Sequence, residues 1–147
     1  MRFSKTLILI AALALVASTV AWAASAAGTS VKVQKTAIGK LIANSKGLTL
    51  YMFRADKGPK SACYGQCATF WPPLTTVGKP VAGPGVKASL LSTAKRKDGK
   101  LQVLYKGHLL YTFAEDKKVG DTKGEGSKAF GAQWYALTPT GVVIDKG

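Results

Sequence analysis

The chain opens with a long apolar run and then changes to short segments in which large apolar side chains alternate with polar ones. Residues 7–20 are apolar with two polar interruptions, and small residues follow at Ala21 and Ala23. This order is typical of a secretory signal peptide, cleaved after Ala23 or, as an alternative, after Ala26. The uninterrupted part of the run is too short to cross a membrane core about 30 Å thick. We therefore predict a signal peptide at 1–23.

Two segments that lie sixty residues apart carry nearly the same pattern. Residues 39–57 align without a gap with residues 99–117, and ten of the nineteen positions are identical. A weaker echo follows, in which the segment that begins at Trp71 parallels the one that begins at Trp134. Self-similarity at a fixed period indicates a tandem duplication of one structural unit.

Each copy of the repeat has the pattern of a β-hairpin. In the first copy, residues 39–43 are strand-like, Lys46 and Gly47 form a turn, and residues 48–53 alternate with a period of two. The same features recur in the second copy at 99–104, Lys106-Gly107 and 108–113. Both faces of 48–53 carry large apolar side chains, so we expect a central strand that is covered on both sides.

The remaining segments complete a small β protein. We expect further strands around Trp71 and Trp134 and at 141–145, and a short helix within 87–96. The two units cannot each bury a core, because an isolated hairpin is only marginally stable. We therefore predict a single compact all-β domain with pseudo-twofold symmetry, sandwich or barrel-like, with at most one or two short helices.

The boundaries of this domain follow from the same segments. A flexible mature N-terminus is expected at 24–34, followed by a single β domain at 35–147. Within that domain we expect repeat one at 39–77, a connector at 78–98 and repeat two at 99–140. The first residues of the connector are rich in proline and glycine.

Charge adds an expectation about partners. The 147 residues include 21 Lys and Arg against 7 Asp and Glu, a formal charge of +14, and loss of Arg2 and Lys5 with the signal peptide leaves +12. The basic residues are spread along the chain, lysine outnumbers arginine 18 to 3, and no nucleic-acid-binding motif is present. We expect an anionic cell-envelope surface or polymer as the partner, and no nucleic acid.

The two copies share the motif Y-x-[FWY]-x-x-D, which supplies the candidate site residues Tyr51, Phe53 and Asp56 in the first copy and Tyr111, Phe113 and Asp116 in the second. In one interpretation, the acids and aromatics converge across the pseudo-twofold axis to bind a ligand. In the favoured one, the aromatics fill the core and each aspartate accepts backbone N–H bonds in the turn that follows it.

Cys63 and Cys67 are the only cysteines, and in a secreted protein their spacing favours a structural disulfide that holds one turn. A copper site or a thiol-exchange site on the two thiols is the alternative, with His108 or Met52 as a third copper ligand. We expect no resident metal and no cofactor.

Catalytic chemistry finds little support in the sequence. No nucleophile elbow, phosphate-binding loop or dinucleotide fingerprint is present, and His108 is the only histidine. A hydrolase would need Asp56 and Asp116 in one cleft about 5–10 Å apart. We predict a protein that is not an enzyme and has no catalytic residues.

Taken in order, the motifs resemble those of the bacterial secreted-repeat family of predicted lipoproteins, which carries the tandem Y-x-[FWY]-x-x-D motif. The resemblance covers about residues 35–140 and includes the two motif copies, the cysteine pair and the Trp71 segment. It implies an exported repeat protein and no particular activity. Because no cysteine precedes Cys63, the lipid-attachment cysteine is missing and no stable membrane anchor is expected after cleavage. We therefore predict a periplasmic or secreted, Sec-exported, non-enzymatic binding module.

Overall fold

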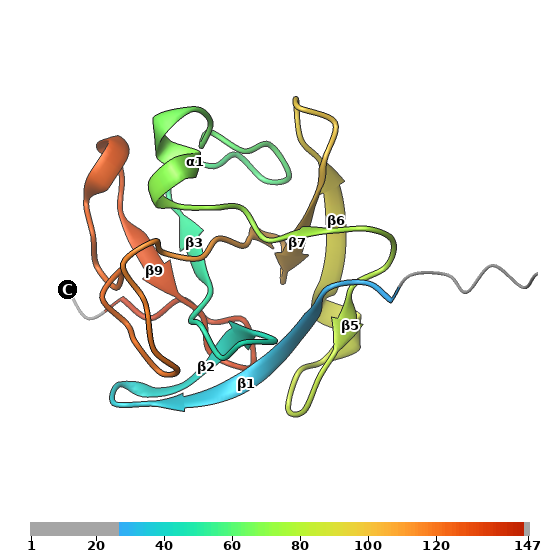
Figure 1. Cartoon of the computed structure of the whole chain (residues 1–147), viewed down its shortest axis with the longest axis vertical. Helices are drawn as coiled ribbons and strands as arrows, with labels where there is room; N and C mark the ends of the chain where they lie inside the picture. Colours follow the sequence, from blue (N-terminus) through green and yellow to red (C-terminus); the bar gives the residue numbers. More distant parts are fainter. Residues whose placement is uncertain (1–26, 146–147) are drawn as a thin grey trace, which may run out of the picture.

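Short strands build the protein. The computed structural model describes residues 27–145, and the predicted signal peptide lies outside them. The elements are β1 (Ser30–Thr36), β2 (Gly39–Asn44), β3 (Tyr51–Phe53), α1 (Gln66–Phe70), β4 (Thr75–Thr76), β5 (Val81–Ala82), β6 (Leu91–Lys95), β7 (Leu101–Tyr105), β8 (His108–Leu109) and β9 (Trp134–Ala136). Figure 1 shows the β1–β2 and β6–β7 pairs on different sides of the molecule. The prediction of a single all-β domain is confirmed, and none of the sheets in this part of the chain closes into a barrel.

The first sheet begins earlier than the sequence predicts. Strand β1 pairs antiparallel with β2 over six residues and parallel with β5, giving the order β2-β1-β5. Val31 is fully buried in the core. The expected flexible N-terminus therefore does not extend over residues 30–34, because each of these residues pairs with β2, with β5 or with both. The connector also contributes β5 to this sheet.

The second sheet has the order β4-β7-β6, and β8 also pairs with β7. The short helix predicted within 87–96 is present only as a 3₁₀ turn at Ala88–Leu90, and the residues that follow form β6 instead. All five residues of β6 pair in register with β7. Pairing with a buried neighbouring strand outweighs the weak local helix propensity of this segment.

The centre of the molecule lies between the two repeats. Strand β3 pairs antiparallel with β9, and all three of its residues are buried, so the central strand predicted at 48–53 is confirmed over its last three residues. Tyr51 N–H donates to the Tyr111 carbonyl at 2.8 Å, and Tyr111 N–H donates to the Tyr51 carbonyl at 2.9 Å. Since the two tyrosines are equivalent residues of the two repeats, this reciprocal pair marks a local pseudo-twofold axis.

The remaining strand predictions hold only in part. Near Trp71 the chain forms a single bridge from Pro73 to Tyr111 before β4, and the segment 141–145 forms only a bridge between Leu137 and Val143.

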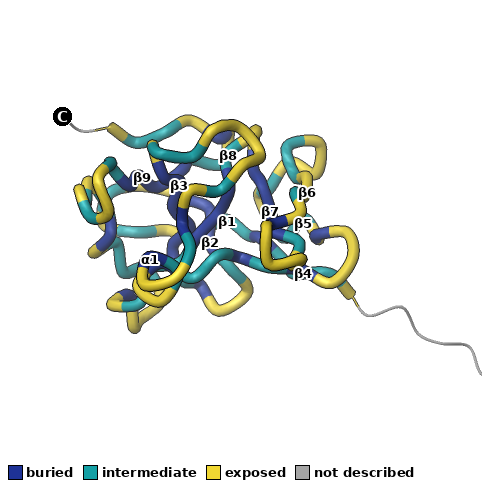
Figure 2. Tube along the Cα trace, turned by 90° about the horizontal axis from the view of Figure 1, so that it is seen from above, coloured by how far each residue is buried: buried dark blue, intermediate teal, exposed yellow. Residues whose placement is uncertain are grey.

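Figure 2 shows burial concentrated along β3, β7 and β9, with exposed loops around them. Among residues 27–145, no helix has the length and apolar character needed to span a membrane.

The gapless sequence match hides a change of register in the first strand of each hairpin. Ile42 N–H donates to the Leu137 carbonyl, and the equivalent bond in the second repeat runs from Val103 to Leu74. Ile42 therefore corresponds to Val103, one position beyond the residue with which it aligns. As a result, the aligned pair Leu41 and Leu101 have different environments: Leu41 is fully buried and Leu101 is partly exposed.

This register change predicts unequal effects of two formally equivalent substitutions. Leu41→Ala should lower the free energy of unfolding by about 3 kcal/mol, because it leaves a cavity in the core. Leu101→Ala should cost about 1 kcal/mol or less, because its side chain is only partly removed from water. Urea unfolding of both variants measures the difference, and equal losses would contradict the shifted register.

Candidate functional site

The motif tyrosines and aspartates pair across the two repeats. The Tyr51 hydroxyl donates to Asp116 Oδ2 at 2.7 Å, and the Tyr111 hydroxyl donates to Asp56 Oδ2 at 2.9 Å. Each tyrosine thus binds the aspartate of the other copy of the motif. The structure brings the two copies together at the pseudo-twofold axis, as crossed pairs.

Each aspartate also holds the turn that follows it. Asp56 Oδ1 accepts the Ala62 N–H at 2.8 Å, and Asp116 Oδ1 accepts the Lys123 N–H at 2.9 Å. The two carboxylates therefore play equivalent parts in the two repeats. With one oxygen on a tyrosine and the other on a backbone N–H, each carboxylate fixes a loop against a strand of the other repeat.

Aromatic side chains from both repeats form one cluster above these pairs. Four rings stack face to face in the order Phe53, Trp134, Trp71 and Phe113, with centroid separations of 4.0, 3.9 and 4.3 Å. The two tyrosines meet the tryptophans edge-on, Tyr51 with Trp71 and Tyr111 with Trp134. A Cβ on Gly124 would lie 2.7 Å from the Trp71 ring, so this close approach requires glycine. The cluster makes the two repeats one core.

Burial shifts the titration of the crossed pairs. It raises the pKa of the Tyr51 and Tyr111 phenols well above the ordinary value of 10.0, and the neighbouring aspartate adds to the shift in each case. Burial also raises the pKa of Asp56 and Asp116, against the hydrogen bonds that favour their charged forms. The phenols therefore keep their protons at neutral pH and act as donors.

A buried arginine extends the network on one side only. The Arg96 side chain is 2% exposed. Its Nη1 donates to Gln102 Oε1 at 2.7 Å and to Ser61 Oγ at 3.1 Å, and its Nη2 donates to the Cys63 carbonyl at 2.7 Å. Its Nε reaches Asp98 at 3.4 Å. No sequence motif indicates this role of Arg96, and its only distinguishing feature in the sequence is that arginine is rare in this lysine-rich chain.

The disulfide includes Cys63, whose carbonyl accepts a hydrogen bond from this arginine. Cys63 and Cys67 are bonded, with Cα atoms 5.2 Å apart, so the predicted bridge is present. The copper alternative on these two cysteines is therefore wrong, because neither sulfur is a free thiolate.

His108 lines a cavity of about 40 Å³ together with Met52 and Asp56, where burial lowers its pKa. Within residues 27–145, no three His, Cys, Asp or Glu side chains cluster as a metal site.

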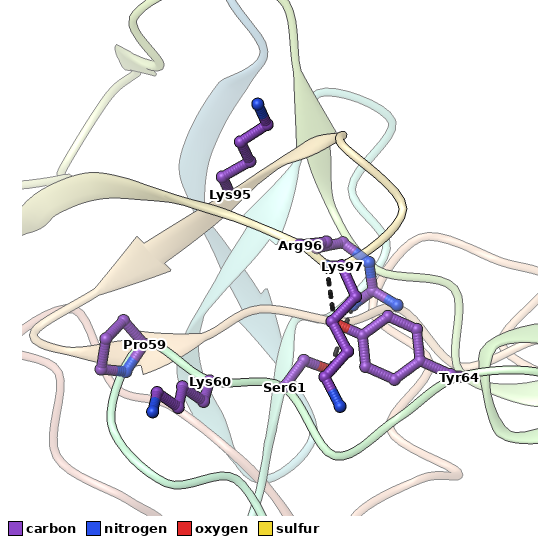
Figure 3. Close-up of a pocket in the computed structure, with 7 residues that line it drawn as sticks. All are labelled: Pro59, Lys60, Ser61, Tyr64, Lys95, Arg96 and Lys97. Atoms are coloured by element: carbon purple, nitrogen blue, oxygen red, sulfur yellow. Dashed lines mark hydrogen bonds between the residues drawn. The ribbon is translucent and has the colours of Figure 1, made fainter.

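A cationic pocket opens on the surface above Arg96. It has a volume of about 530 Å³ and is lined by Pro59, Lys60, Ser61, Tyr64, Lys95, Arg96 and Lys97. Figure 3 shows Arg96 and Lys97 beside the Tyr64 ring, with Lys60 on the other side of Ser61 and the Lys95 ammonium turned away. The Arg96 guanidinium lies 4.3 Å from the Tyr64 ring centroid. We refer to this site as the cationic pocket.

The buried phenols predict a loss of stability in alkali. The folded protein holds two phenol protons that the unfolded chain releases above about pH 10, so these protons stabilise the fold fully below that pH and progressively less above it. Each phenol makes the free energy of unfolding fall more steeply with pH, by up to about 1.4 kcal/mol per pH unit. Urea unfolding between pH 8 and 11.5 measures the slope.

The Tyr51→Phe/Tyr111→Phe variant is the control, because it retains the lysines that also titrate in this range. It should be less stable than wild type at pH 8 and decline less steeply above pH 10. Parallel slopes for the two proteins would show that the phenols do not carry the effect.

Comparison with known proteins places the chain in a family. A family model described as a secreted repeat of unknown function matches residues 32–75 and 92–138, which correspond to the two copies of the repeat. No curated protein and no solved structure matches the chain. The two matches together cover more than half of the chain and contain both crossed Tyr–Asp pairs. The chain therefore belongs to this family of secreted repeats, as the motifs indicated.

Proposed function

We propose that the protein is a secreted, non-enzymatic module that binds anionic polymers or surfaces of the cell envelope through the cationic pocket. The observation that carries this proposal is the lining of the pocket, which contains three lysines and an arginine and no carboxylate, while Asp98 pairs with the arginine from outside the lining. Such a concentration of one charge attracts anions from a distance and raises their local concentration. Export through the Sec route to the periplasm or the exterior is part of the proposal.

The contacts of Ser61 support binding over catalysis. Its hydroxyl accepts the Cys63 N–H and an Arg96 N–H, and it shares a 2.7 Å hydrogen bond with the Tyr111 hydroxyl. A nucleophilic serine needs a neighbour that takes its proton. Tyr111 cannot be that base at neutral pH, because burial keeps its own phenol protonated. The pocket therefore offers charge and shape, and no activated nucleophile.

Charge reversal in the pocket tests the proposal. Lys60→Glu/Lys97→Glu should weaken binding to long-chain polyphosphate at least tenfold at 0.05 M salt, because it replaces the two exposed ammonium groups beside Ser61. Binding by wild type should also fall steeply between 0.05 and 0.5 M salt. Fluorescence anisotropy with labelled polymer measures the affinities.

Lys35→Glu/Lys46→Glu is the matched control, because it changes the net charge equally at exposed positions outside the pocket, in β1 and in the turn after β2. It should weaken binding less than threefold. Equal losses in both variants would show that binding is diffuse and has no site at the pocket. Absence of binding by the wild-type protein to polyphosphate, polyglutamate and anionic vesicles would overturn the proposed function.

A further inference from the structure

We infer that the cationic pocket selects phosphate groups over carboxylates; this inference rests on the proposed function and names the chemistry of its ligand. It depends on which cations in the pocket still have donors to offer. Arginine and lysine recognise anions differently, since the planar guanidinium fork matches a carboxylate with two parallel bonds and an ammonium acts as a point charge.

The guanidinium fork of Arg96 is already occupied. A guanidinium has five N–H donors. Four of them have acceptors within the protein: Asp98, Ser61, Gln102 and the Cys63 carbonyl. Neither edge of the group has two free donors, and the side chain is 2% exposed. Arg96 therefore gives the pocket positive charge without the paired donors that favour a planar carboxylate.

The free donors of the pocket belong to lysines. Lys60 and Lys97 are exposed residues on the two sides of Ser61. Each ammonium has three rotatable donors. Two point charges that approach one group from different sides suit a tetrahedral phosphate, whose oxygens point in several directions, better than a planar carboxylate with its two oxygens in one plane.

Tyr64 keeps one of these lysines at the pocket. The Lys97 N–H donates to the Tyr64 hydroxyl at 3.1 Å, and the Lys97 ammonium lies 5.7 Å from the centroid of the same ring. The Arg96 guanidinium lies 4.3 Å from the ring centroid. Tyr64 therefore holds the Lys97 backbone at the pocket, with the ammonium group near the same ring.

The experiment compares two polymers on three proteins. Affinities of wild type, Lys60→Arg/Lys97→Arg and the control Lys35→Arg/Lys46→Arg are measured for long-chain polyphosphate and for polyglutamate of similar length at 0.1 M salt. Wild type should prefer polyphosphate at least tenfold. The pocket arginine variant should lose most of this preference by gaining affinity for polyglutamate, because each new side chain brings a free fork. The control should keep the wild-type preference.

Two further arms identify the source of the phosphate. Competition by inorganic phosphate at millimolar concentration, with no competition by equal acetate, would support recognition of the phosphate group itself. If wild type sediments with phosphatidylglycerol vesicles and Lys60→Gln/Lys97→Gln does not, a lipid headgroup is supported as the source. If the same variant loses polyphosphate binding while its sedimentation with vesicles is unchanged from wild type, a phosphate polymer is supported as the source.

The outcomes separate the inference from the proposed function. Equal wild-type affinities for the two polymers, both weakened in Lys60→Gln/Lys97→Gln, would overturn phosphate selectivity and leave the anion-binding function standing. A preference for polyphosphate that Lys60→Arg/Lys97→Arg leaves unchanged would also overturn the inference, because selectivity would then not come from the ammonium groups. Binding of neither polymer nor vesicles would overturn both.

Discussion

The reciprocal backbone pair between Tyr51 and Tyr111 is the contact on which the rest of the structure depends. It joins equivalent residues of the two repeats at the pseudo-twofold axis. From that point each side chain reaches the aspartate of the other repeat, at 2.7 and 2.9 Å. Hydrogen bonds to a charged acceptor contribute about 1.5–3 kcal/mol each. Each repeat therefore supplies the tyrosine that binds the aspartate of the other repeat.

Symmetry in the core allows asymmetry at the surface. The crossed pairs and the stacked rings serve both repeats alike, whereas the disulfide, Arg96 and the cationic pocket lie on one side only. Ser61 connects the two systems, since its hydroxyl meets both Tyr111 and Arg96. The twofold core therefore carries the disulfide and the pocket at only one of its ends.

The sequence predicted those features that depend on local pattern or on composition. Period-two alternation and the sixty-residue match led to the β-hairpins and the single domain, and the cysteine spacing led to the disulfide. The sequence did not predict β6, because its pairing with β7 is a tertiary effect that local propensity does not carry. The role of Arg96 was equally hidden, since its partners Ser61, Cys63 and Gln102 lie at separations that no motif links.

The central claim is that the two repeats form one interlocked core, and equilibrium urea unfolding with two probes tests it most directly. Tryptophan fluorescence reports on the stack of Trp71 and Trp134, which lies between the repeats, and far-ultraviolet circular dichroism reports on all strands. Coincident single transitions are expected, because neither repeat can keep its core without the other. Two separate transitions, with loss of the fluorescence signal while half of the strand signal persists, would contradict the account.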